Sequence, residues 1–296
     1  MGGIIGNIGY TIKVNYNSHG VTKQLTFTNV GQIGYSTSIN VSKTASQGDH
    51  SASVIFLNIK DDITRFLFRT ENTFGKSGMI EITTTRGIHC GRIFKGSISR
   101  AIPSGFPETN LTIDALCGNF FSELFTISAT TLQTRHELKQ MFANQMSFQL
   151  KDDVEEDKNI KLSKNFFYQG RSPLRRLQVF FQEQNVYVDG NSLCFIPREN
   201  KVKISNLKQS ARIKELSEKT GIIGTISVND ATSINVQHIS LPDLQLGQII
   251  KINCKFPNNA KYNGTWFING LQNDLDIKNS PSATTTITLG ATNFSM

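Results

Sequence analysis

The sequence has few of the features on which enzymes and metal proteins depend. Its four cysteines, Cys90, Cys117, Cys194 and Cys254, lie far apart among 296 residues. None of them forms the close pair of a zinc or redox motif, so buried free thiols in a reducing compartment are expected. The five histidines are equally scattered, and neither a His-Glu-x-x-His pair nor a phosphate-binding glycine loop occurs. These absences predict a protein with no catalytic residue, no cofactor and no metal.

Long apolar runs and dense charge are also missing. Residues 2–9 are apolar and glycine-rich, but the stretch is short and lacks a charged start, so we expect neither a secretory signal nor a membrane anchor. The formal charge is +8, yet charged residues make up only 18% of the chain. Basic residues concentrate only at 171–176 and 201–219. This mild basicity is more typical of solubility or of an acidic protein partner than of a nucleic-acid site, which would show steep salt dependence.

What the sequence does contain is the pattern of β-strands. Phenylalanine occurs 20 times against a single tryptophan, and β-branched residues are plentiful. Ile250, Ile252, Cys254 and Phe256 alternate with polar residues, which indicates a strand with one buried face. The turn residues of 257–264 follow, and an apolar strand containing Trp266 comes next, so the two runs predict a hairpin. Core packing is the expected role of Trp266, with an interface anchor as the alternative.

The same order of strands occurs twice. Residues 78–82, 91–98 and 110–116 repeat the succession of 247–256, 264–271 and 284–289. Three positions match at one common offset: Gly91 with Gly264, Phe94 with Phe267, and Ile98 with Leu271. The step from Phe94 to Ile113 is 19 residues and that from Phe267 to Ile287 is 20. Matched order and spacing predict two related β-modules.

The first module opens with a predicted hairpin of 10–16 and 21–27. Further strands are expected at 34–41 and 52–59, with a turn-rich insert at 42–51. Residues 61–68 fit a strand or a short helix equally well. In the second module, residues 204–219 fit a helix or a linker that contains a strand at 212–214.

Helical spacing appears only in the middle of the chain. Residues 131–144 place Leu138, Met141 and Phe142 on one face of a helix, with Thr130 or Thr131 as its N-cap. A second helix is predicted to start at Ser172 and Pro173, and a hairpin follows at 185–196. The acidic run 151–158 is interpreted as a solvated loop. The fold class is therefore mainly β (α+β overall), with two tube-like β-barrel modules at 1–118 and 201–296 and an α+β middle domain at 119–200.

Two sequence motifs, together with the order of the predicted elements, resemble those of a known protein family. The first is 220–224 followed by Leu241-Pro-Asp-Leu-Gln-Leu-Gly, the strand that follows it, and Asn263-Gly-Thr-Trp-Phe-Ile; the second is Phe166-Phe-Tyr-Gln-Gly-Arg-Ser-Pro-Leu-Arg-Arg-Leu. With them, nearly the whole chain resembles the baseplate hub proteins of contractile phage tails, whose fold also occurs in the N-terminal part of type VI secretion spike proteins. The closing Trp-x-Thr phrase usual in that family is replaced by 283–287 here.

The resemblance implies a structural virion protein rather than an enzyme. Such hubs carry two tube-like barrels per subunit and form a trimeric, pseudo-sixfold ring that joins the hexameric tail tube to the trimeric central spike for envelope puncture and genome delivery. Expected partners are two further copies, the tube, the spike and other baseplate proteins, with DNA passing the lumen unbound. The expected location is the virion tail, after assembly in the host bacterial cytoplasm.

Leu241, Leu244 and Leu246 are the predicted subunit contact, with core packing as the competing role. The alternative function is a β-rich receptor- or carbohydrate-binding tail protein, which would need aromatic residues exposed in loops.

Overall fold

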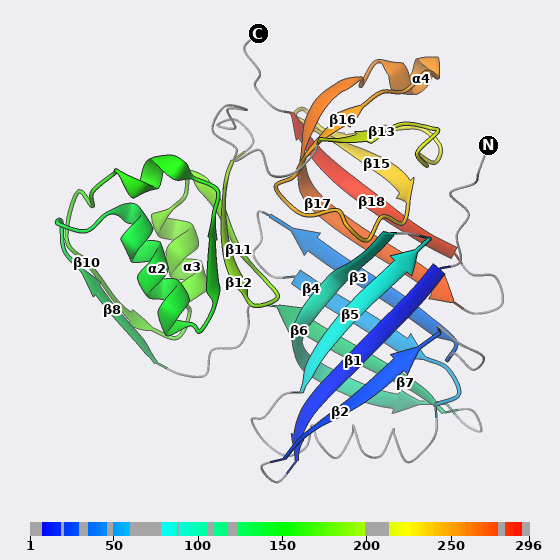
Figure 1. Ribbon diagram of the computed structural model, residues 1–296, viewed down its shortest axis with the longest axis horizontal. Coiled ribbons are helices and arrows are strands. Elements are labelled where there is room, and N and C mark those ends of the chain that lie inside the picture. Colours follow the sequence, from blue (N-terminus) through cyan, green and yellow to red (C-terminus); the bar gives the residue numbers. More distant parts are fainter. Residues whose placement is uncertain are drawn as a thin grey trace.

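A computed structural model describes residues 8–18, 21–29, 35–45, 50–59, 78–87, 89–105, 109–117, 124–198, 213–277 and 282–291. The chain is mainly β, as its composition predicts, and Figure 1 shows one lobe of strands with a smaller lobe beside it. Within the described ranges, no helix has the length and apolar character needed to cross a membrane. The undecided segment 61–68 lies outside these ranges.

The described residues of the first module form seven antiparallel strands in the spatial order β3-β4-β7-β6-β5-β1-β2. Their bounds are β1 Ile8–Ser18, β2 Val21–Thr28, β3 Thr37–Thr44, β4 His50–Phe56, β5 Met79–Arg86, β6 His89–Ser104 and β7 Asn110–Cys117. The predicted opening hairpin is confirmed, with Ser18 opposite Val21 at its turn. The predicted insert at 42–51 is too long, because β3 continues to Thr44 and β4 begins at His50. Lys43 and His50 are polar but buried, so the apolar pattern does not reveal these strand ends.

The second module follows the middle domain in the sequence. It contains β13 Lys214–Leu216, β14 Ser227–Asp230, β15 Ser233–Ile239, β16 Ile249–Ile252, α4 Pro257–Ala260, β17 Gly264–Ile277 and β18 Ser282–Ala291. Of the undecided segment 204–219, residues 213–219 are described, and within them Lys214–Leu216 form strand β13, slightly later than the strand considered at 212–214.

In the described ranges, the strands of the two modules form one sheet of 13 strands. β17 pairs with β16 and β18 of its own module, and its second half pairs with β3, from Gly270 opposite Thr44 to Ile277 opposite Thr37. The described pairings form an open path from β14 at one edge to β2 at the other, with β13 and β16 as a side branch. The modules are therefore fused through a shared strand, and the described pairings do not close either one into a barrel.

The predicted repeat has a structural counterpart. β5-β6-β7 and β16-β17-β18 are both antiparallel meanders with a long central strand. In each, the matched phenylalanine is buried on the central strand and faces an isoleucine of the strand before it: Phe94 opposite Ile82, and Phe267 opposite Ile249. Ile98 and Leu271 are buried as well. The repeat therefore holds for the strand order and for burial, but not for packing. Phe94 and Ile98 share one core cluster, whereas Leu271 lies in the core of the second module and Phe267 lies in a separate cluster with Tyr187 and Cys194.

The middle domain is an α+β lobe in which two helices lie between two small sheets (Figure 1). Its elements are β8 Phe125–Ala129, α2 Arg135–Gln145, β9 Gln149–Asp152, the 3-10 turn η1 Glu155–Lys158, β10 Phe166–Gly170, α3 Pro173–Phe180, β11 Gln184–Asp189 and β12 Ser192–Pro197. β8 pairs with β10, and the second sheet has the order β11-β12-β9. Aromatic rings fill the space between them, with Phe142 and Phe166 centroids 5.8 Å apart and Phe181 and Phe195 centroids 5.3 Å apart.

Both predicted helices are present, with one correction to their starts. α2 begins after Thr134 rather than after Thr130 or Thr131. The Thr134 hydroxyl accepts the Glu137 N–H while the Glu137 carboxylate accepts the Thr134 N–H, so this reciprocal capping box fixes the first turn. α3 begins at Pro173 as predicted, although the Ser172 side chain makes no capping hydrogen bond.

Candidate functional site

The described residues hold no group of three or more His, Cys, Asp or Glu side chains that could bind a metal ion. The buried histidines His50 and His238 lie in different modules, and His136 lies on α2, where its Nδ1 is 2.7 Å from an Asp152 carboxylate oxygen. Three cysteines are buried as predicted, while Cys90 is exposed. The sites that organise the molecule are instead two sets of buried polar contacts that hold its parts together.

The first set lies where the β11–β12 hairpin meets the first module, and we call it the module junction. It comprises Lys43, His50, Cys117, Tyr187 and Asp189. The Lys43 ammonium donates to the Asp189 carboxylate at 2.9 Å, and the Cys117 thiol donates to the Val188 carbonyl at 3.2 Å. The His50 ring packs on the Tyr187 ring with centroids 5.3 Å apart. Strands β3, β4 and β7 of the first module thus all contact the β11–β12 hairpin of the middle domain.

Burial sets the electrostatics of this junction. It lowers the pKa of His50 to about 4, with repulsion from Lys43 as a second cause. Burial raises the pKa of the Cys117 thiol to about 11 and that of the Tyr187 hydroxyl well above its usual value. Burial alone would also raise the pKa of Asp189, but the charge and hydrogen bond of Lys43 outweigh it and the pKa is lowered. The junction thus holds one ion pair, a neutral imidazole and protonated thiol and phenol groups.

An added side chain at the tip of the same hairpin would strain the backbone and displace the end of Arg92. Gly190 has φ +62°, and a Cβ there would lie 2.8 Å from the Arg92 guanidinium of β6. On its other side the hairpin meets the second module, because the Tyr187 hydroxyl donates to the Leu246 carbonyl at 3.4 Å. Tyr187 and Cys194 also pack with Phe267 of β17 in one small apolar cluster. One hairpin therefore contacts both β-modules.

The connection that carries the three predicted contact leucines docks within the chain. Leu241 and Leu244 are 6% and 8% exposed and belong to the core of the second module, while Leu246 is partly buried between that core and the hairpin. At Gly91 of β6 the backbone is so close that an added Cβ would lie 2.2 Å from the Pro242 carbonyl oxygen. Core packing thus accounts for Leu241 and Leu244, and a subunit contact at these leucines stays a prediction.

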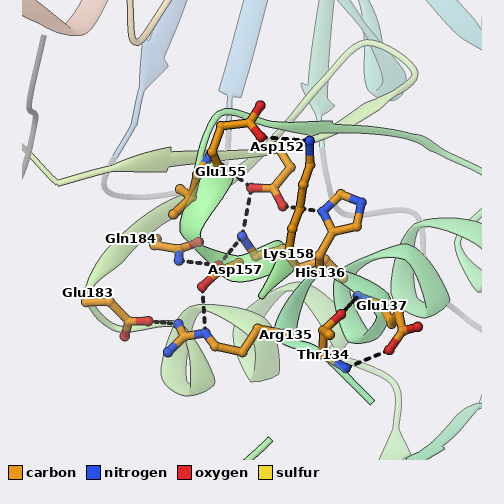
Figure 2. A network of polar contacts seen from close by, with 12 residues as sticks. Thr134, Arg135, His136, Glu137, Asp152, Glu155, Asp157, Lys158, Glu183 and Gln184 are labelled. Atoms are coloured by element: carbon orange, nitrogen blue, oxygen red, sulfur yellow. Dashed lines mark hydrogen bonds and ion pairs between the residues drawn. The ribbon is translucent and has the colours of Figure 1, made fainter. Parts of the chain in front are cut away.

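The second set is a buried ionic network inside the middle domain, shown in Figure 2. Lys139 of α2 is 0% exposed, and its ammonium lies 2.8 Å from an Asp152 oxygen and 2.5 Å from an Asp157 oxygen. Arg135 pairs with Asp157 at 2.8 Å and also with Glu183. The Lys139 ammonium also lies 4.5 Å from the Phe195 ring centroid, in cation–π geometry. The network ties α2 to β9, η1 and the start of β11.

This network corrects the interpretation of 151–158 as a solvated loop. Asp152 and Asp157 have side chains only 3% exposed, and Gln184 donates to Asp157 at 2.6 Å. Sequence reasoning missed both aspartates because an acidic run is usually solvated, and their cationic partners lie on a helix elsewhere in the sequence. The available signal was Lys139, a lysine beside the predicted inward-facing Leu138. A buried lysine requires a buried anion.

Comparison with known proteins adds an independent view of the fold. No protein-family model matches the sequence, and no curated protein matches it. Among solved structures, the tail protein from Neisseria meningitidis MC58 superposes with a TM-score of 0.61 at 10% identity, covering 95% of this chain and 96% of that one. The chain has the fold of a phage tail protein. A chain of the lidless PdpA–VgrG complex gives a TM-score of 0.62 at 10% identity, over 99% of this chain and 67% of that one.

A third match connects this tail-protein fold to secretion systems. The E. coli c3393 protein, described as a component of the type VI secretion system with structural similarity to the T4 bacteriophage tail proteins gp27 and gp5, superposes with a TM-score of 0.52 at 10% identity. The match covers 89% of this chain and 75% of that one. The predicted resemblance to the hub and spike-related fold is confirmed.

Proposed function

We propose that the chain is a structural protein of a contractile tail, a baseplate hub that joins the tail tube to the central spike. The likeness of the whole chain to phage tail proteins supports this assignment at the level of fold. The role is mechanical, and it requires no bond to be made or broken by this chain. Its place would be the virion tail, among the other baseplate proteins, with the genome passing through the lumen of the ring.

The observation that carries the proposal is the repeated meander within one sheet. A closed ring of three copies would present six similar modules, since each chain supplies β5-β6-β7 and β16-β17-β18. Six modules match a hexameric tube on one side, while the threefold axis matches a trimeric spike on the other. The fusion of both modules through β17 and β3 fixes their relative orientation within each subunit.

The hub assignment is tested by native mass across a concentration series, together with electron-microscope class averages of the heaviest species. A trimer of the 32.9-kDa chain has a mass of about 99 kDa and would show a ring with a central hole. Purified tube and spike proteins of the same tail should each bind that ring. A monomer at every concentration that stays monomeric when mixed with both proteins contradicts the hub. Saccharide titration of that monomer would then test the receptor-binding alternative.

A further inference from the structure

The two meanders differ most in the connection between their first two strands. In the first module β5 and β6 pair as far as Arg86 opposite His89, which leaves only positions 87 and 88 between them. In the second module the last pair is Ile252 opposite Gly264, and positions 253–263 lie between them and include α4. We call these positions the α4 loop. Figure 1 shows α4 projecting from the end of the second module, away from the first.

Three side chains, Glu218 of a neighbouring segment and Asn259 and Asn263 of the loop itself, fix the α4 loop to the second module. The Glu218 carboxylate accepts the backbone N–H groups of Lys255 and Phe256, at 3.1 and 3.2 Å. The buried Asn259 side chain accepts the Ile226 N–H at 2.9 Å and donates to the Gly224 carbonyl at 3.1 Å. At the base of the loop, the Asn263 amide bonds both backbone groups of Cys254. The loop backbone is therefore held in one conformation in the free chain.

This fixed backbone presents an exposed aromatic ring among cations. The Phe256 side chain is 64% exposed although Glu218 binds the backbone N–H groups of Lys255 and Phe256. Ile223, beside the Asn259 contact at Gly224, is 37% exposed. Lys255 and Lys261 of the same loop are exposed, and neither forms an ion pair within the described part of the chain. The Lys261 ammonium lies 4.9 Å from the Tyr262 ring centroid. The nearby Glu218 already accepts two backbone N–H groups. An exposed aromatic residue on a hydrogen-bonded loop that also carries two exposed lysines has the composition of a protein-binding anchor.

We propose that the α4 loop docks the trimeric spike. This inference rests on the proposed hub. In a ring of six similar modules the loop occurs at every second module, hence three times, which suits a partner of threefold symmetry. A hexameric tube makes six equivalent contacts and would meet the loop at only half of them. The charge of the loop requires a spike surface with carboxylates around an apolar pocket that receives the Phe256 ring.

The test compares two exposed phenylalanines in the full-length chain. F256S removes the proposed anchor, and F167S is the matched control because Phe167 on β10 is 62% exposed in the middle domain. Each variant is titrated with the purified trimeric spike and, separately, with the purified tube protein of the same tail. We expect F256S to weaken spike binding by about tenfold or more, as for a central interface aromatic, with tube binding unchanged. F167S should bind both proteins as the wild type does. The double variant K255E/K261E should weaken spike binding and reduce its salt dependence.

The outcomes separate this inference from the hub assignment. Native mass and ring images of F256S report whether the ring survives, since the loop belongs to no described contact between modules. An intact ring whose spike affinity is unchanged by F256S overturns the inference and leaves the hub in place. Equal weakening by F256S and F167S, or loss of tube rather than spike binding, also overturns it. A wild-type ring that binds the tube but not the spike overturns it as well. Failure of the wild type to assemble with either protein overturns the hub and the inference together.

Discussion

The β-lobe, which comprises both modules, and the middle domain bury their interiors in different ways. Along β7 every second residue is buried, and Leu111, Ile113 and Ala115 are apolar. The middle domain also has an apolar core, yet at its centre lies Lys139 between two aspartates whose side chains are 3% exposed. An apolar face needs only the right period, whereas a buried ionic network needs every partner in place. The middle domain should therefore be more sensitive to single substitutions of charged residues than the β-lobe.

The largest effect is expected from Lys139→Met. The substitution keeps most of the side-chain volume but leaves Asp152 and Asp157 buried without their ammonium partner, which costs about 3–5 kcal/mol. Urea unfolding measures the loss, and hydrogen exchange shows whether it falls on the middle domain. Lys158→Met is the control, because its pair with Glu155 is exposed and should contribute less than about 1 kcal/mol. Equal losses for the two variants would contradict the contrast between the lobes.

Acid should lower the stability of the boundary between the two lobes, where His50 is buried. The pKa of His50 is lowered to about 4 by burial and by Lys43, while the unfolded chain binds this proton near its ordinary value of 6.5. Between pH 4 and 6.5 the His50 imidazole is therefore more protonated in the unfolded state than in the folded state. Its contribution to the free energy of unfolding is fully present above pH 6.5 and falls as the pH drops toward 4. The difference corresponds to roughly 3 kcal/mol at most. His238, whose pKa burial also lowers to about 4, adds a similar loss within the second module.

His50→Gln separates the junction from the second module. The variant cannot take up the proton, so its urea midpoint should fall less between pH 6.5 and 4 than that of the wild type, while the part due to His238 remains. His89→Gln is the matched control, because the His89 side chain is 40% exposed and its 3.6 Å contact with the equally exposed Asp243 should contribute little. An unchanged pH profile in His50→Gln would show that the junction does not respond to acid.

A smaller effect is expected within the β-lobe from Gly91→Ala. The added Cβ would meet the Pro242 carbonyl oxygen, so β6 and the connection before β16 must move apart, at a cost of roughly 1–3 kcal/mol. Thermal unfolding measures this cost, with Cys90→Ala at the exposed neighbouring position as the control. An unchanged unfolding temperature in Gly91→Ala would mean that the connection containing Pro242 can shift without loss of stability.

The smallest effect should come from Thr134→Ala, which removes the N-cap of α2. The first turn then loses the hydroxyl that accepts the Glu137 N–H, at a cost of about 1 kcal/mol. Urea unfolding should register this loss in the middle domain, with Thr131→Ala as the control at the N-cap position first predicted. A larger loss from Thr131→Ala would place the start of α2 earlier in the sequence.

Much of the fold could be predicted because a strand places alternate side chains on opposite faces. That period predicted the opening hairpin and the repeat containing Phe94 and Phe267. The pairing of β17 with β3 could not be predicted, since it joins strands more than 200 positions apart in the sequence and no local pattern encodes it. The burial of Lys43 and His50 could not be predicted for a related reason. Both are polar residues whose burial depends on Asp189 and Tyr187 of another domain.

The candidate sites were less accessible to sequence reasoning than the fold. Leu241 and Leu244 were predicted as a subunit contact with core packing as the competing role; within the chain they pack in the core of the second module, and the subunit contact stays a prediction. Phe256 was assigned to the alternating strand, and only the structure shows that β16 ends before it and leaves the ring exposed. Position along a strand predicts a face, but the end of a strand depends on the contacts of the residues beyond it.

The shared strand β17 has a consequence for how the molecule carries force. Its second half is antiparallel to β3 over eight successive residue pairs, and antiparallel hydrogen bonds run perpendicular to the strands. Tension along the strand axis therefore loads these bonds in shear and all together, instead of unzipping them one by one. Pulling the two modules apart along this axis would require the whole ladder to fail at once, so a thrust delivered to one module passes to the other without a hinge.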